Sequence, residues 1–207
     1  MLIYNITVRG SSTPTRRRDP QQGRASLRRD SLLDAAGELF TEVGFGGTTM
    51  TAIAERANAS VGALYDYFPD KTTLANVLAT RYTKEADEHW SVLLTPEGFS
   101  TTKQLAELFV DGILSFVEKR PSYPALLSAP IKYARSATAR RPLRRIFAKA
   151  VRRVNASLTS EQAHFHAQVV VELLKALVAS YALAAVADRD NLAENFKRLV
   201  SHYLTHT

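Results

Sequence analysis

The sequence predicts an all-α fold in two parts, with a small unit of the helix-turn-helix type near the N-terminus and a larger helical domain after it. Apolar residues recur at three- and four-residue steps from about Ala25 almost to the C-terminus. Proline and small polar residues separate the helical segments, and no alternating strand pattern is present. With 45% hydrophobic and 23% charged residues, the 207-residue chain has the composition of a folded globular protein.

Residues 1–24 lack this periodicity. They carry the run Arg16-Arg17-Arg18 together with Arg24, two prolines and several Ser and Thr residues. We predict a flexible, arginine-rich arm, a composition that suits contact with a polyanion. A tail that makes no contact has the same composition, and the sequence leaves both interpretations open.

The first helix is predicted from about Ala25, with an apolar stripe that ends at Val43. Gly44 ends this helix because glycine accepts the left-handed conformation at little steric cost, and Phe45 then folds back onto the last turn. Gly37 lies inside the helix, where it costs about 1 kcal/mol of helix propensity.

Two short helices with a tight turn between them are predicted next. Thr49 is a suitable N-cap for a helix over residues 50–57, and Ser60 for a helix over residues 61–68. Asn58 tolerates the left-handed conformation that a tight turn requires. Each of these signals is local, so together they predict the order helix, turn, helix.

Small side chains allow these two helices to cross closely. Ala54, Ala57 and Ala63 face inward in the predicted pattern, which gives the steep crossing of a helix-turn-helix. Asp70 is the expected N-cap of the helix that follows. Two ordinary short core helices would show the same pattern, and that alternative stays open at this point.

The rest of the chain is predicted to form five or six further helices. Residues 163–186 are apolar nearly all round, so their helix is expected to be buried on more than one side. Glu172 and Lys175 interrupt this apolar run, which argues against a membrane span, and no export signal is apparent. We therefore expect a cytoplasmic protein. The predicted segments are residues 71–94, 101–119, 122–137, 142–158, 161–187 and 190–205.

Several classes of protein are excluded. Without cysteine, the chain has no disulfide, thiolate zinc site, iron–sulfur cluster or thiol nucleophile. It has no phosphate-binding glycine motif and no nucleophile elbow. His202 and His206 share a helix face near the C-terminus, but we expect no metal site and no cofactor. The sequence therefore predicts a protein that is not an enzyme.

A longer pattern joins the first four predicted helices. It comprises Phe40-Thr41-Glu42-Val43-Gly44-Phe45, then Thr48-Thr49, then the run from Ile53 to Lys71 that ends in Tyr65-Asp66-Tyr67-Phe68-Pro69-Asp70-Lys71. This pattern, which covers about residues 25–75, resembles the TetR family of transcriptional regulators. One departure is Asn58, where the family usually has glycine.

The resemblance implies a homodimer with a DNA-binding domain at residues 25–72 and a helical effector-binding and dimerisation domain at residues 73–207, after the arm at 1–24. We expect the dimer interface at about residues 161–205, where four helices would pack about a two-fold axis. The partners would be a double-stranded DNA operator, a second copy of the chain and a small-molecule effector.

The same resemblance implies which residues contact DNA. The helix that begins at Val61 would enter the major groove, with apolar contacts to thymine methyl groups and a close backbone approach at Gly62. Tyrosine and threonine hydroxyls and the Lys71 ammonium would reach phosphates. The expected residues are Thr49, Thr51, Val61, Gly62, Ala63, Tyr65, Tyr67 and Lys71, with Arg16, Arg17, Arg18 and Arg24 of the arm as possible additions.

An effector pocket is expected among aromatic residues of the middle helices, although an aromatic stripe is also typical of an ordinary core. The residues are Trp90, Phe109, Phe116, Tyr123, Tyr133 and Phe147. The sequence thus predicts a sequence-specific repressor that an effector releases from its operator. A helical protein-interaction module without DNA binding is the alternative.

Charge does not locate the DNA contact. The net charge of +7 arises mainly outside the predicted helix-turn-helix, because residues 131–153 contain nine Lys and Arg and no acid. This block predicts an amphipathic surface helix after Pro142, with Arg144 on its basic side. Attraction for an anionic effector or for a second DNA surface remains an alternative.

Overall fold

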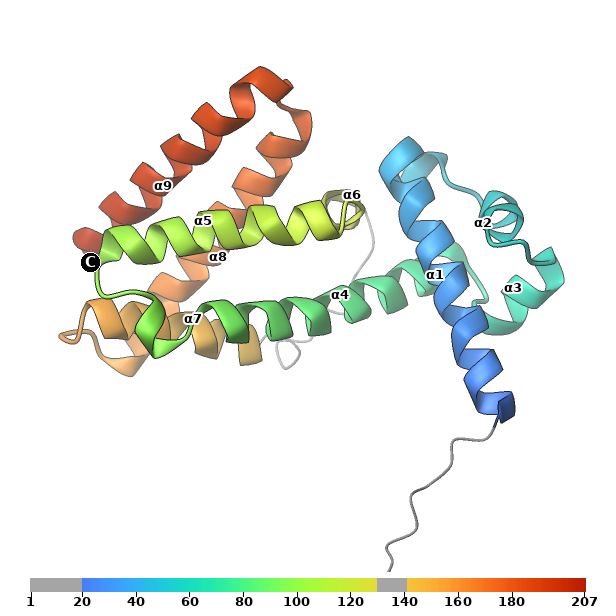
Figure 1. Ribbon diagram of the computed structural model, residues 1–207, viewed down its shortest axis with the longest axis horizontal. Coiled ribbons are helices and arrows are strands. Elements are labelled where there is room, and N and C mark those ends of the chain that lie inside the picture. The colour runs from blue at the N-terminus through green and yellow to red at the C-terminus, as the bar shows by residue number, and fades with distance from the viewer. Residues whose placement is uncertain (1–19, 130–140) are drawn as a thin grey trace, which may run out of the picture.

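The computed structural model of this chain describes residues 20–129 and 141–207, and every regular element within these ranges is a helix (Figure 1). The predicted all-α fold is confirmed. The elements are α1 (Pro20–Gly47), α2 (Met50–Arg56), α3 (Val61–Tyr67), α4 (Lys71–Leu93), α5 (Thr102–Lys119), α6 (Tyr123–Ser128), α7 (Arg141–Val154), α8 (Ser160–Leu183) and α9 (Arg189–Thr205), with short 3-10 turns at Pro96–Gly98 and Val186–Asp188.

The helix bounds follow the predicted ones closely where a capping residue is present. Thr101 and Thr159 each form a capping box with a glutamine three residues later, at the starts of α5 and α8. Two predicted bounds are wrong: α1 begins at Pro20 and takes in the last residues of the predicted arm, and the helix predicted over residues 122–137 ends at Ser128, because Ala129 adopts an extended conformation. Arg24 is exposed on α1. Arg16, Arg17 and Arg18 lie outside the described residues, as do residues 130–137 of the predicted segment 122–137.

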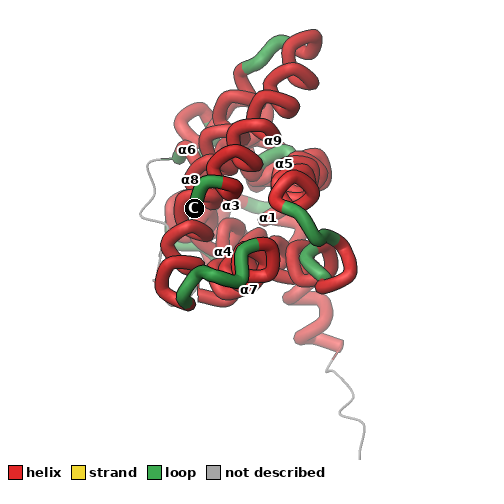
Figure 2. The backbone as a smooth tube through the Cα atoms, turned by 90° about the vertical axis from the view of Figure 1, so that its left-hand side faces the viewer, coloured by secondary structure: helices red, strands yellow, loops and turns green. Residues whose placement is uncertain are grey.

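Two groups of helices make up the molecule. The helices α1, α2 and α3 form a small unit, and α5 to α9 form a larger one in which α5 packs against α4, α7, α8 and α9 (Figures 1 and 2). The helix α4 runs from the small unit into the larger one. The larger unit has an aromatic centre, where the rings of Trp90, Phe109 and Phe147 have centroids 4.5 to 6.1 Å apart.

The two units meet at a tight junction between α1, α4 and the start of α6. Gly37 of α1 lies here, and a Cβ atom on it would be 3.1 Å from the Ser122 Oγ and 3.3 Å from the Tyr82 hydroxyl. Glycine at this position therefore lets α1 approach closely, which explains a residue that helix propensity disfavours. An ion pair between Arg81 and Asp34, at 2.5 Å, ties α4 to α1 beside it.

Apolar side chains are exposed on the outer helices α8 and α9. Phe165 is 65% exposed, Leu183 89% and Leu199 47%. Within one chain α8 packs against α5, α6, α7 and α9, so it is covered on more than one side as expected, while Phe165 and Leu183 remain exposed. In the part of the chain that the structure describes, α8 is also the one helix long and apolar enough to span a membrane. A single such helix is weak evidence for a span, because a core helix of a soluble protein passes the same test.

Candidate functional site

The turn between α2 and α3 is built from local signals. Asn58 adopts a φ of 49°, so the predicted left-handed turn residue is confirmed. The Thr49 hydroxyl accepts a hydrogen bond from the Ala52 N–H and the Ser60 hydroxyl accepts one from the Ala63 N–H, each at 3.1 Å. These caps fix where both helices begin and hence the angle at which α3 leaves the turn.

Buried side chains decide which face of α3 is outside. Leu64 and Phe68 are buried against Ile53 of α2 in the shared core. The rest of α3 is left at the surface, with Tyr65 49% and Tyr67 36% exposed. This helix and α2 lie on the side of α1 that faces away from α5 to α9 (Figure 1).

The N-terminal turn of α3 presents very small side chains. Val61 and Gly62 are exposed and Ala63 is partly exposed. A Cβ atom built on Gly62 would meet nothing within 4 Å, so the protein itself does not require glycine there. A narrow, unobstructed helix end of this kind can approach a groove or a flat surface closely.

Arg56 at the end of α2 is fully engaged within the protein. Its guanidinium forms a two-pronged ion pair with Glu42, both N–O distances being 2.8 Å, and a further bond of 3.1 Å to Glu38. The hydrogen bonds and charge of Arg56 lower the pKa of the Glu42 carboxyl. These bonds hold α2 on α1 and neutralise the only cation of the helix-turn-helix between residues 49 and 70.

Lys71 lies in a different environment from the one predicted. Its ammonium donates hydrogen bonds of 2.6 Å to the Phe45 and Thr48 carbonyl oxygens, and it sits 4.5 Å from the centroid of the Phe45 ring. These carbonyls are free because Gly44, with a φ of 72°, breaks the regular helix just before them. In this structure Lys71 therefore caps the end of α1, and only a rearrangement would direct its ammonium to a phosphate.

The remaining predicted DNA contacts are at the surface. Thr49 and Thr51 are exposed in the first turn of α2, where the Thr49 hydroxyl also serves as the N-cap. The structure thus gathers the predicted residues of α2 and α3 in one compact unit and separates Lys71 from them by its bonds. Their contact with DNA stays a prediction.

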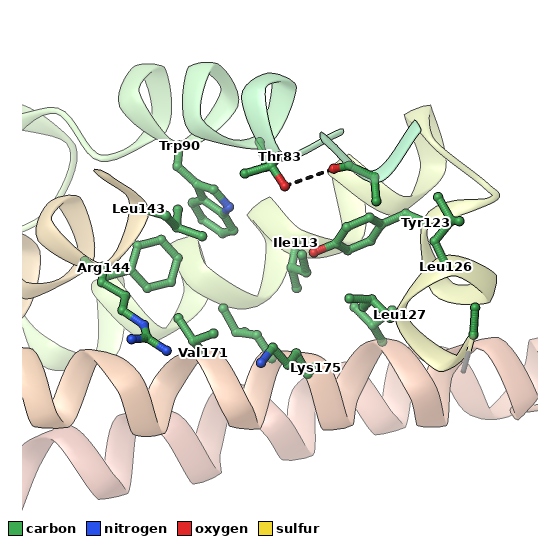
Figure 3. Close-up of a pocket in the computed structure, with 16 residues that line it drawn as sticks. Thr83, Trp90, Ile113, Tyr123, Leu126, Leu127, Leu143, Arg144, Val171 and Lys175 are labelled. Carbon is green, nitrogen blue, oxygen red and sulfur yellow. Dashed lines mark hydrogen bonds between the residues drawn. The ribbon is translucent and has the colours of Figure 1, made fainter. Parts of the chain in front are cut away.

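A second site lies inside the larger unit, as a cavity of about 130 Å³ between α4, α5, α6, α7 and α8 (Figure 3). Of the predicted aromatic residues, Trp90, Tyr123 and Phe147 line it. Phe109 and Phe116 are buried in the core beside it and do not line it, and Tyr133 lies outside the described residues. Most of the wall is aliphatic: Ala79, Ala86, Ile113, Leu126, Leu127, Ala129, Leu143, Val171, Leu174 and Val178.

Three polar side chains complete the wall, and the sequence did not single them out for this site. They are Thr83, Arg144 and Lys175. Thr83 donates to the Ala79 carbonyl, while the nitrogen ends of Arg144 and Lys175 lie on the side of the cavity next to α8 (Figure 3). The available signal for Lys175 was its position within the apolar run of residues 167–187, which only Glu172 also interrupts.

Comparison with known proteins assigns both parts of the chain to one family. Residues 32–78 match the family of bacterial regulatory proteins named tetR, and residues 102–204 match the tetracyclin repressor-like C-terminal domain. The transcriptional regulator BetI of Escherichia coli is 32% identical over 173 residues, which cover 82% of this chain and 83% of BetI.

Solved structures share the fold. A TetR-family regulator from Streptomyces coelicolor has a TM-score of 0.65 and 22% identity over 86% of this chain and 98% of its own. FadR from Bacillus subtilis, solved in complex with stearoyl-CoA, has a TM-score of 0.64 and 16% identity over 84% of this chain and 96% of its own.

A capped helix-turn-helix joined by one helix to a domain with an apolar cavity defines a ligand-responsive DNA-binding regulator. The matches over both parts of the chain make the assignment specific. The chain belongs to the TetR family of bacterial transcriptional regulators. This family is not enzymatic, and membership favours DNA binding over the alternative of a protein-interaction module.

Proposed function

We propose that this chain represses transcription as a two-fold dimer, binds its operator through α3 and leaves it when a small molecule enters the cavity between α4 and α8. We divide the chain into the two domains that the sequence suggested, a DNA-binding domain at residues 25–72 and an effector-binding and dimerisation domain at residues 73–207. Because an operator lies on chromosomal DNA, the protein would act in the cytoplasm.

The observation that carries this proposal is the exposed, open N-terminal turn of α3. Val61 and Ala63 offer apolar contacts that suit thymine methyl groups, and the missing side chain of Gly62 lets the backbone approach the bases. Tyr65 and Tyr67 reach outward on the same short helix and suit phosphates, as do Thr49 and Thr51 at the start of α2.

Exposed apolar side chains support a dimer through α8 and α9. Phe165, Leu183 and Leu199 would leave water if a second copy packed on these two helices. A two-fold dimer presents two copies of α3 to half-sites that lie one helical turn of DNA, or a multiple of it, apart. An effector then acts by favouring a dimer state whose α3 helices no longer fit that spacing.

The cavity supports control by a small molecule. It lies beside α4, and Lys71 at the start of that helix is bonded to the turn that precedes α2. A change at the cavity that tilts α4 therefore moves the helix-turn-helix with it. FadR from Bacillus subtilis, which shares the fold, was solved in complex with stearoyl-CoA.

The test is a substitution that adds one methyl group at Gly62. The operator is first isolated by selecting genomic DNA fragments with the purified protein. Gly62→Ala has room in the protein and favours the helix, so we expect it to raise the thermal stability slightly while weakening operator binding by about tenfold or more. The matched control is Gly46→Ala, because a Cβ there also meets nothing within 4 Å.

Tyr65→Phe and Tyr67→Phe should each weaken operator binding as well, by removing an exposed hydroxyl without changing the core. Thr80→Ala, which removes an exposed hydroxyl on α4, is their control. Undiminished operator affinity in Gly62→Ala and both tyrosine variants would contradict the assignment of α3 as the recognition helix.

A further inference from the structure

We propose that the cavity binds a small apolar monocarboxylate, about the size of one aromatic ring, with its carboxylate held by Arg144 and Lys175. This inference rests on the proposed function, since it names the chemical class of the molecule that enters the cavity. It follows from the charge, the composition and the size of the cavity wall.

The charge of the wall is positive. Arg144 and Lys175 line the cavity, and no Asp or Glu is among the described residues that do so. Lys175 shares one bond of 2.7 Å with Glu172, a residue outside the wall. Arg144 is half-buried and has no ion pair with a carboxylate in the described ranges. A partly buried cation beside apolar groups attracts an anion, and a guanidinium matches a carboxylate with two parallel hydrogen bonds.

The two basic side chains are well placed to act on one ligand. They come from different helices, α7 and α8, yet their nitrogen ends lie on the same side of the cavity (Figure 3). Trp90 and Thr83 of α4 lie on the opposite side. A carboxylate between the two cations would thus direct the rest of its molecule toward α4.

The space available for that remainder is small and apolar. Trp90 is 2% and Phe147 1% exposed, and Ile113 closes the wall from α5. The volume of about 130 Å³ is close to that of an apolar protein cavity of about 150 Å³ that holds benzene. One aromatic ring, or a short alkyl chain, therefore fits.

The aromatic wall by itself would also suit a quaternary ammonium ligand, because cations bind to the faces of aromatic rings. The two basic side chains oppose such a ligand by charge repulsion. The sign of the ligand's charge is therefore the property that decides between these two possibilities, and it can be tested with ligands of matched shape.

The experiment compares benzoate, benzamide and benzamidine, three ligands of nearly the same shape that carry a negative, no and a positive charge. Binding to the full chain is measured by calorimetry and by the shift in melting temperature, with hexanoate as an aliphatic acid. We expect benzoate or hexanoate to bind about tenfold or more tightly than benzamide, and benzamidine to bind least.

Two charge-removing variants, Arg144→Met and Lys175→Met, keep most of the side-chain volume. Each should weaken carboxylate binding by about tenfold while leaving benzamide binding unchanged. Arg145→Met is the control, since Arg145 is the exposed neighbour on the same helix and does not line the cavity. Melting curves without ligand show that each variant is folded, and Lys175→Arg, which keeps the charge, should retain binding if Lys175→Met does not fold.

Three results would overturn the inference: benzamidine or benzamide binding as tightly as the acids, carboxylate affinity unchanged in both Met variants, or no binding of either acid at millimolar concentration. The proposed function and this inference can be contradicted independently of each other. If a neutral or cationic compound releases the operator and the acids do not, only the inference is wrong. If the acids bind with the expected charge dependence and never change operator affinity, only the release mechanism is wrong.

Discussion

The hydroxyl oxygens of Tyr82 and Ser122 lie 2.6 Å apart in a buried contact between α4 and the start of α6. Ser122 directly precedes Tyr123, which lines the cavity, and its Oγ is the atom closest to the space beside Gly37 on α1. The contact thus connects the wall of the cavity to the helix that carries the DNA-binding unit. We therefore expect a ligand that moves Tyr123 to act on α1 through this serine.

We expect Ser122→Ala to lower the free energy of unfolding by about 1–3 kcal/mol, because it leaves the buried Tyr82 hydroxyl without this partner. The double variant with Tyr82→Phe should lose less than the sum of the two single losses, since no hydroxyl is then left unpaired. Urea denaturation of the single and double variants measures the coupling. Strictly additive losses would show that the two hydroxyls do not interact.

Lys71 provides a second test, because the structure and the sequence interpretation predict different outcomes. Removing the ammonium in Lys71→Met leaves the Phe45 and Thr48 carbonyls without their donor, so we expect a loss of about 1–3 kcal/mol in unfolding free energy. A pure phosphate ligand would instead affect operator binding and leave stability unchanged. Lys84→Met is the control, since Lys84 is 81% exposed and has only a long ion pair of 3.8 Å.

The dimer face can be tested with one charge. Phe165→Glu places a carboxylate in the proposed α8–α9 interface, and we expect it to shift the protein to monomers in sedimentation experiments, because an unpaired buried charge is costly. The matched control is Val92→Glu on α4, because the side chains of Val92 and Phe165 are similarly exposed, at 74% and 65%. A dimer that survives Phe165→Glu but dissociates in Val92→Glu would place the interface elsewhere.

Asp87 predicts a specific dependence of stability on pH. Burial raises the pKa of its carboxyl, and its Oδ1 atom has no hydrogen-bond partner in the described ranges. As the pH rises through the normal range of aspartate, the unfolded chain loses this proton first. The unfolding free energy of the wild type should therefore fall relative to Asp87→Asn until the raised pKa of the folded state is passed.

Melting curves of both proteins across this pH window check the prediction. Glu88→Gln is the control on the same helix, because the Glu88 side chain is 68% exposed. A difference in melting temperature between the wild type and Asp87→Asn that does not change with pH would contradict this prediction.

Local signals made the helix-turn-helix predictable from sequence. The hydroxyls of Thr49 and Ser60 and the carboxylate of Asp70 each bind an N–H three residues along the chain, and Asn58 adopts its turn conformation without help from distant residues. Such contacts depend on neighbours in sequence, which is why their positions could be predicted to the residue.

Contacts between distant residues were not predictable in this way. Gly37 is explained by Ser122 and Tyr82, and Lys71 by carbonyls of residues 45 and 48 that a break at Gly44 makes available. The sequence placed Arg144 on the outer side of a basic helix, whereas the structure turns it toward a cavity formed by five helices. Aromatic residues at helical spacing did not distinguish the wall from the core, so Trp90 and Phe109 looked alike.

The continuity of α4 has a mechanical consequence. Its 23 residues give it a length of about 34 Å, with Lys71 attached to the turn before α2 at one end and Trp90 in the cavity wall near the other. A rigid rod of that length turned by only about 5° at the cavity displaces its far end by about 3 Å. We therefore propose that α4 acts as a lever arm, so that a ligand no larger than one ring in the cavity would displace α2 and α3 by about 3 Å.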